Sequence, residues 1–117
     1  MARPPVFRDA DEAVSVVKDG DAIMVAGFGG RGSPVSLLAA VGRKGPHGLT
    51  IIANGPNEST DTPETPGLVR RKLVSRVIVS FPVAMTSAAG VRPFEEQWQQ
   101  GLIALETVPQ GTLAERI

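Results

Sequence analysis

The sequence predicts an α/β fold in which helices flank an open, mostly parallel sheet. Three observations support this class. Short apolar runs with the length of strands alternate with helix-like segments along the chain. The runs contain few polar residues, as expected of strands that are buried on both faces of a parallel sheet. Two of them flank one helix within about 30 residues, as in a βαβ unit with its right-handed crossover.

The first helix is predicted to begin at Asp9. Asp9 and Glu12 have the spacing of a capping box, alanine and valine residues follow at helical positions, and Gly20 is expected to end the helix. Residues 22–26 form an apolar run between Gly20 and Gly27 that is too short for a helix. This run is the first predicted strand, and we expect it to be buried on both faces.

The second helix is predicted to follow a glycine-rich stretch. Ser33 is a good N-cap and Pro34 a good first helical residue. Gly45 and Pro46 are expected to end this helix, and residues 49–53 form the next apolar strand. Strand, helix and strand together make the predicted βαβ unit.

The second half of the chain is predicted to add two strands to the sheet. Residues 55–66 are rich in polar residues and proline, so we expect a mobile surface loop there. Strands are expected at residues 74–81 and 102–108, with a short helix at residues 94–100 between them.

The last residues resemble the beginning of another helix. Residues 109–111 are predicted to form a turn, after which Thr112 and Glu115 have the spacing of a capping box. The sequence ends at Ile117, within the first turn of that helix, and so short a helix is marginal on its own. We therefore expect residues 1–117 to be the N-terminal part of a longer domain, or to be completed by another chain.

Composition and charge exclude several classes of function. Twelve Lys and Arg residues balance twelve Asp and Glu residues, which argues against a nucleic acid or an anionic membrane as partner. The chain has no cysteine and one histidine, so a disulfide framework, a cysteine nucleophile and a protein-built zinc site are not expected. No apolar run approaches the roughly 20 residues of a spanning helix, and no export signal is visible. We expect a cytoplasmic protein without a metal site.

Residues 27–32, Gly-Phe-Gly-Gly-Arg-Gly, lie between a predicted strand and a predicted helix start. Backbone N–H groups and the helix dipole favour an anion at such a position. The glycines fit the pattern of dinucleotide-binding, Rossmann-like units, which also need an acidic residue at the end of the next strand. That strand ends at Asn54, and the next carboxylate is Glu58 in the predicted loop. A dinucleotide site and a tight turn without ligand remain alternatives.

A longer pattern around these glycines resembles the first signature of family I coenzyme A transferases. It begins with Asp19 and Gly20, continues through the apolar residues 23–25, and ends at Gly32 and Pro34. The family normally has glycine where alanine stands at position 26.

Two further segments resemble the same family. Residues 49–54 are similar to its strand that ends in paired asparagines, with Asn54 matching the first and Gly55 replacing the second. Residues 106–117, which contain Pro-Gln-Gly-Thr, resemble the family's segment of that sequence. The three segments occur in the expected order along the chain.

The resemblance implies that this chain is part of an enzyme that moves CoA between a short acyl-CoA and a carboxylate or 3-oxo acid. In the family, the beta subunit carries a glutamate that attacks the acyl-CoA and then holds CoA as a thioester. That glutamate lies in a Ser-Glu-Asn-Gly segment, which this sequence lacks. The resemblance therefore implies the N-terminal part of the alpha subunit, with CoA as substrate, no permanent cofactor, and the beta subunit for its partner in a hetero-oligomer. Acyl-CoA hydrolysis and a non-catalytic assembly role remain alternatives.

The resemblance also implies site residues. Gln110 resembles the family glutamine that faces the reacting carbonyl, and a carboxamide can donate to a developing oxyanion. Asn54 is expected to orient Gln110 or the substrate, because parallel strand ends meet at the binding edge. An exposed turn glutamine and a turn-forming asparagine are the simpler alternatives for these two. The substrate-binding loop is expected to comprise Gly27, Phe28, Gly29, Gly30, Gly32 and Pro34.

Overall fold

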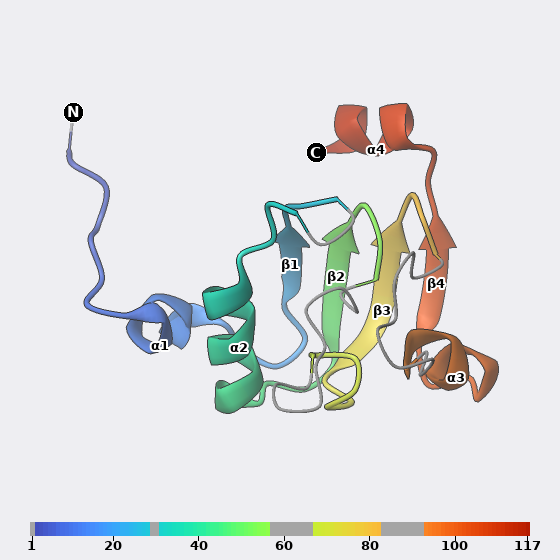
Figure 1. Cartoon of the computed structure of the whole chain (residues 1–117), viewed down its shortest axis with the longest axis horizontal. Helices are drawn as coiled ribbons and strands as arrows, with labels where there is room; N and C mark the ends of the chain where they lie inside the picture. The colour runs from blue at the N-terminus through green and yellow to red at the C-terminus, as the bar shows by residue number, and fades with distance from the viewer. Residues whose placement is uncertain (1, 29–30, 57–66, 83–92) are drawn as a thin grey trace.

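The computed structural model describes residues 2–28, 31–56, 67–82 and 93–117. Four parallel strands form one sheet in the order β1 (Ala22–Val25), β2 (Leu49–Ala53), β3 (Val74–Val79) and β4 (Ala104–Thr107). Figure 1 shows the strands side by side with their carboxyl ends at one edge. The predicted α/β class and all four predicted strands are confirmed.

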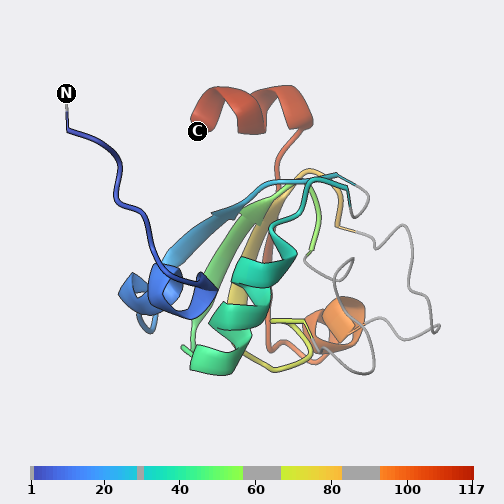
Figure 2. The ribbon, with the colours of Figure 1, turned by 60° about the vertical axis from the view of Figure 1, so that its left-hand side comes forward.

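The two faces of this sheet differ in what covers them. Figure 2 shows α2 (Val35–Lys44) and α3 (Pro93–Gln99) on one face of the sheet. Ile51 and Val77 are fully buried in the core that also contains Leu38 of α2 and Phe94 of α3. Met24, Ile52 and Ile78 share the opposite face through the strand register, and Met24 is 61% exposed. The prediction that the first strand is buried on both faces is therefore wrong. β1 is an edge strand of the sheet, which leaves Met24 largely open to solvent.

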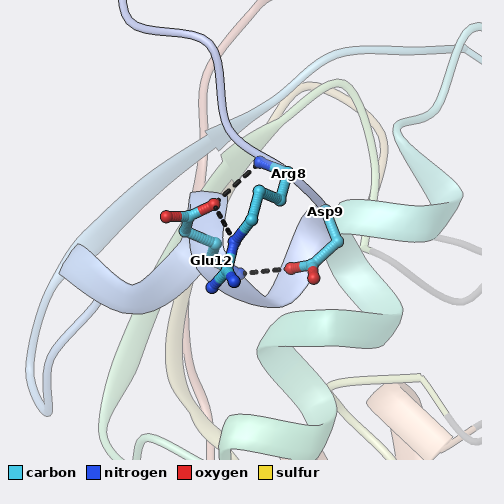
Figure 3. A network of polar contacts seen from close by, with 3 residues as sticks. All are labelled: Arg8, Asp9 and Glu12. Carbon is cyan, nitrogen blue, oxygen red and sulfur yellow. Dashed lines mark hydrogen bonds and ion pairs between the residues drawn. The ribbon is translucent and has the colours of Figure 1, made fainter.

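The first helix begins as predicted and ends early. The Asp9 carboxylate accepts a hydrogen bond from the backbone N–H of Glu12 (2.8 Å), and Glu12 accepts one from the N–H of Arg8 (2.7 Å) (Figure 3). This is the reciprocal arrangement of a capping box, displaced by one residue. The helix α1 (Ala10–Ala13) then passes into a 3₁₀ turn (Val14–Val16), because β-branched side chains disfavour further helical turns.

The second helix, α2 (Val35–Lys44), ends as predicted at Gly45, which adopts a left-handed conformation (φ 73°). Its start differs from the prediction, because Pro34 is the N-cap and no side chain caps the helix. The Ser33 side chain lies against Gly27 instead, where a Cβ atom would come within 2.6 Å of the Ser33 Oγ. Contact with the preceding loop thus replaces the predicted cap.

The third helix, α3 (Pro93–Gln99), confirms the short helix predicted between the last two strands. Of the predicted loop 55–66, only Gly55 and Pro56 are among the described residues. Among the described helices, none combines the length and apolarity needed to cross a membrane.

The last helix, α4 (Gln110–Arg116), begins two residues before the predicted start at Thr112. Pro109 is its N-cap, and the Pro109 carbonyl accepts a hydrogen bond from the N–H of Leu113 (2.8 Å). The predicted turn and capping box at this point are wrong, because proline holds φ near −53° and lets the helix begin at once. Figures 1 and 2 show α4 running back from β4 across the carboxyl ends of the strands.

Candidate functional site

A cavity of about 320 Å³ lies between α4 and the carboxyl ends of β1 and β2. The helix contributes the residues that share one face by their spacing of three and four, namely Gln110, Leu113, Ala114 and Ile117. The strands contribute Met24, Val25, Ala26, Ile52, Ala53 and Asn54. The walls are mostly apolar, and the side-chain carboxamides among them are those of Asn54 and Gln110.

Asn54 joins the ends of three strands. Its side-chain Nδ2 donates to the Gly27 carbonyl oxygen after β1 (2.7 Å), and its own carbonyl accepts from the N–H groups of Ser80 (3.1 Å) and Phe81 (2.7 Å) after β3. β3 consequently ends at Val79, two residues earlier than predicted. The structure thus places Asn54 both against the glycine-rich loop and on the cavity that Gln110 also lines.

The Asn54 side chain offers a direct test of this junction. We expect Asn54→Asp to lower the free energy of unfolding of the full chain by about 1–3 kcal/mol, because a carboxylate oxygen would then face the Gly27 carbonyl without a proton. Chemical denaturation at neutral pH measures the change. Gln99→Glu, an exposed amide-to-carboxylate change on α3, is the control and should stay within about 0.5 kcal/mol. Equal effects of the two substitutions would contradict a structural role of the Asn54 amide.

The glycine-rich loop turns tightly after β1. Gly27 has φ 118°, and a Cβ atom there would lie 2.6 Å from the Ser33 Oγ and 3.0 Å from the Arg31 carbonyl oxygen. Gly32 also has a positive φ of 75°, and Pro34 follows as the N-cap of α2. Only glycine fits position 27, because it lacks the Cβ atom and tolerates this backbone conformation.

Phe28 and Arg31 form the base of this turn. They exchange backbone hydrogen bonds in both directions, with N–O distances of 2.9 and 3.1 Å. The Phe28 ring meets the Phe81 ring edge to face, with centroids 6.3 Å apart. The backbone N–H groups of Phe28 and Arg31 were predicted to face an anion. They instead donate to carbonyl oxygens within the loop. Gly29 and Gly30, also predicted to bind substrate, lie outside the described residues.

The structure brings some predicted site residues together and leaves others apart. Asn54 and Gln110 line one cavity, and Asn54 also bonds to Gly27. Phe28 and Pro34 are not among the residues that line the cavity. Gln110 is the first residue of α4, is exposed, and is among the residues that line the cavity. In the described part of the chain, no three His, Asp or Glu side chains gather to hold a metal ion.

Sequence reasoning missed an ion-pair network beside this site. Glu106 of β4 accepts hydrogen bonds from Arg116 of α4 and from Arg76 of β3, each at 2.8 Å and each on a different carboxylate oxygen. The sequence contained a signal for this network, because Glu106 is a carboxylate in a strand whose other residues are apolar or neutral. The hydrogen bonds from Arg116 and then Arg76 lower the pKa of Glu106 below its ordinary value of 4.5.

The lowered pKa of Glu106 predicts a pH dependence of stability. Because the folded-state pKa lies below the unfolded value, the ionised carboxylate stabilises the fold above about pH 4.5 and loses this effect as the pH falls through the folded-state pKa. Urea unfolding of the full chain at about pH 6 and about pH 3 should show a smaller pH-dependent loss in Glu106→Gln than in the native sequence. Identical pH profiles of the two proteins would contradict this prediction.

The chain is similar to proteins of one family. The sequence model of a family described as Coenzyme A transferase matches residues 7–117. A 3-oxoadipate CoA-transferase subunit of Pseudomonas putida is 40% identical over 111 residues, which are 95% of this chain and 46% of that protein. The chain therefore spans less than half of the length of this curated relative.

Two solved structures share the fold. A glutaconate coenzyme A-transferase from Acidaminococcus fermentans superposes with a TM-score of 0.72 at 20% identity, over 92% of this chain and 32% of that one. A variant of the decarboxylase AibA/AibB superposes with a TM-score of 0.63 at 26% identity, over 83% of this chain and 36% of that one.

Proposed function

Because this chain belongs to the coenzyme A transferase family, we propose that it supplies the oxyanion-binding half of a site that moves CoA between a short acyl-CoA and a carboxylate or 3-oxo acid. One observation carries the proposal. Gln110 and Asn54, which are far apart in the sequence, line one cavity at the carboxyl ends of parallel strands. This is the edge at which open α/β sheets bind their ligands.

The proposed reaction begins on the partner, the beta subunit. Its glutamate carboxylate attacks the thioester carbonyl carbon of the acyl-CoA, and the carbonyl oxygen becomes an oxyanion. Collapse of this intermediate expels the CoA thiolate and leaves an acyl-glutamyl anhydride. The thiolate then attacks the glutamyl carbonyl, which releases the first carboxylate and forms a glutamyl-CoA thioester. The second carboxylate takes up CoA through the same steps in reverse.

The proposed contribution of Gln110 is a hydrogen bond to the oxyanion. Its Nε2 carries two N–H donors and no charge, so it can donate to a developing negative charge without a proton transfer. Because Gln110 lines the cavity and is exposed, this donor can meet a substrate that is held partly by another chain. Asn54 supports the same edge by holding the end of β2 to the glycine-rich loop.

The cavity walls suggest which part of the substrate lies there. Apolar side chains from β1, β2 and α4 surround the two carboxamides. We therefore place the uncharged part of a short acyl group against these walls, with its carbonyl directed to Gln110. We also propose the cytoplasm as the location, since the chain has no cysteine and CoA esters are intracellular substrates.

Covalent trapping tests which of the two chains carries the nucleophile. The complete enzyme, with both chains present, is incubated with acyl-CoA, quenched, and analysed by intact-mass spectrometry. We expect no CoA adduct on this chain and the mass of a CoA thioester on the partner. A CoA adduct on this chain would overturn the proposal that the nucleophile lies on the partner. CoA release without any transfer to an acceptor acid would instead favour acyl-CoA hydrolysis.

The alternative of a dinucleotide site can be tested in the same preparation. The family match and the absence of a carboxylate at the end of β2 both argue against this alternative. We expect acyl-CoA to raise the melting temperature of the enzyme and NAD to leave it unchanged. Stabilisation by NAD alone would revive the dinucleotide interpretation.

A further inference from the structure

We propose that Glu106 is a positioning residue that bridges Arg76 and Arg116 and so fixes the rotation of α4, which turns Gln110 toward the cavity. The inference rests on the proposed function, because the proposed hydrogen bond to the oxyanion requires the Gln110 side chain to point into the cavity. It concerns an ion-pair network to which the transfer reaction itself assigns no role.

In the part of the chain that the structure describes, few side chains of α4 are buried. Leu113 is its buried residue, whereas Ala114 and Ile117 on the same face border the cavity and are exposed. Among the described residues, the packing of α4 is therefore confined largely to the Leu113 side chain.

Two side-chain contacts help to set which face of α4 meets the strand ends. Leu113 is the first, and Arg116, one turn further along, is the second through its bond to Glu106 (2.8 Å). A helix attached at Leu113 alone can turn about its own axis. A turn of about 100°, the angle between successive residues, would bring Gly111 to the place of Gln110. The Arg116 contact opposes that rotation.

The Glu106 carboxylate is itself held from the other side. Its second oxygen accepts from Arg76 on the neighbouring strand β3, so the carboxylate is fixed to the sheet before it meets α4. Single exposed ion pairs contribute little because both side chains must be ordered for one contact. In this network the Glu106 carboxylate binds both guanidinium groups. Its bond to Arg76 on β3 already orders the carboxylate for the contact with Arg116. The short sequence separation of Glu106 and Arg116 also limits the entropy lost on closing the contact.

Substitutions at both ends of the contact test the inference in the complete two-chain enzyme. We expect Glu106→Gln and Arg116→Met to lower kcat by about 10- to 100-fold, the loss that follows when a catalytic group is displaced by up to about 1 Å. KM for acyl-CoA should change little, because Gln110 is proposed to act on the oxyanion of the transition state. Arg116→Lys, which keeps the positive charge, should recover most of the lost kcat.

The control is an ion pair of similar exposure on the other side of the fold. Arg43 of α2 meets Asp11 of α1 at 3.0 Å, and the Arg43 side chain is 54% exposed compared with 51% for Arg116. Arg43→Met should leave kcat unchanged. Hydrogen exchange of the α4 amides gives a readout that does not depend on activity. It should be faster in Glu106→Gln and Arg116→Met than in the native enzyme or in Arg43→Met.

The outcomes separate this inference from the proposed function. Unchanged kcat in Glu106→Gln and Arg116→Met, while Gln110→Ala is impaired, would overturn the positioning role. Unchanged exchange of the α4 amides in both variants would overturn it as well. Faster exchange together with an unimpaired Gln110→Ala would show that Glu106 orders α4 and that the role proposed for Gln110 is wrong.

Discussion

Replacement of Gln110 by alanine should lower kcat of the complete enzyme by about 10²–10³-fold, equivalent to about 2.7–4 kcal/mol of transition-state stabilisation. The loss is expected to be large because the carboxamide would donate to an oxygen whose charge develops only during the reaction. A water molecule that replaces the carboxamide is not held in position and restores little of this effect. Steady-state kinetics with a short acyl-CoA and a 3-oxo acid measure kcat and KM separately.

Thr112→Ala is the matched control for this experiment. Thr112 lies on the same helix as Gln110, is exposed, and does not line the cavity. Its removal should change kcat by less than about twofold, since surface substitutions of this kind alter stability by at most about 0.5 kcal/mol. Equal losses in both variants would mean that α4 tolerates no change at all. Unchanged kcat in Gln110→Ala would show that the glutamine is a surface residue of the helix.

Replacement of Gly27 by alanine should destabilise the full chain by several kcal/mol. The backbone contributes about 1–3 kcal/mol, because φ 118° is a region that side chains rarely adopt. The added methyl group contributes about 1–3 kcal/mol more, because it would lie 2.6 Å from the Ser33 Oγ and 3.0 Å from a backbone oxygen. Thermal or chemical unfolding measures the sum.

Gly101→Ala separates the two contributions. Gly101 also has a positive φ, 74°, but its Cβ position has no heavy atom within 4 Å. We expect a cost of about 1–2 kcal/mol there, from the left-handed backbone alone. A loss for Gly27→Ala that is no greater than for Gly101→Ala would contradict the close contact between the loop and Ser33. Relief of the Gly27→Ala defect by Ser33→Ala would support that contact.

Whether a prediction from the sequence succeeded depended on the range of the interactions that produce the predicted feature. Apolar runs correctly located four strands, and Gly45 correctly marked the end of α2, because strand length and a left-handed cap depend on neighbouring residues. The capping box at Asp9 formed for the same reason. The predicted caps at Ser33 and Thr112 failed, because each was displaced by a competing local start or by a contact with the preceding loop.

Burial could not be predicted in the same way. The run at residues 22–26 has the composition of a central strand, yet β1 lies at an edge with Met24 exposed. The composition of a strand indicates whether both of its faces can be buried. The position of the strand in the sheet decides whether they are. The sequence spans less than half of the curated relative from Pseudomonas putida, so its composition also reflects a longer protein.

For the candidate site, sequence patterns were enough to identify the family, the glycine that the loop after β1 requires, and Asn54 and Gln110 as candidates. The three-dimensional arrangement was needed to show that these two carboxamides share one cavity, that Asn54 holds Gly27, and that Glu106 links α4 to the sheet. This difference follows from the range of the interactions involved. Motifs and caps depend on residues that are close in the chain, whereas a site at the end of a parallel sheet is formed by strand order and by the direction in which a short helix lies across it.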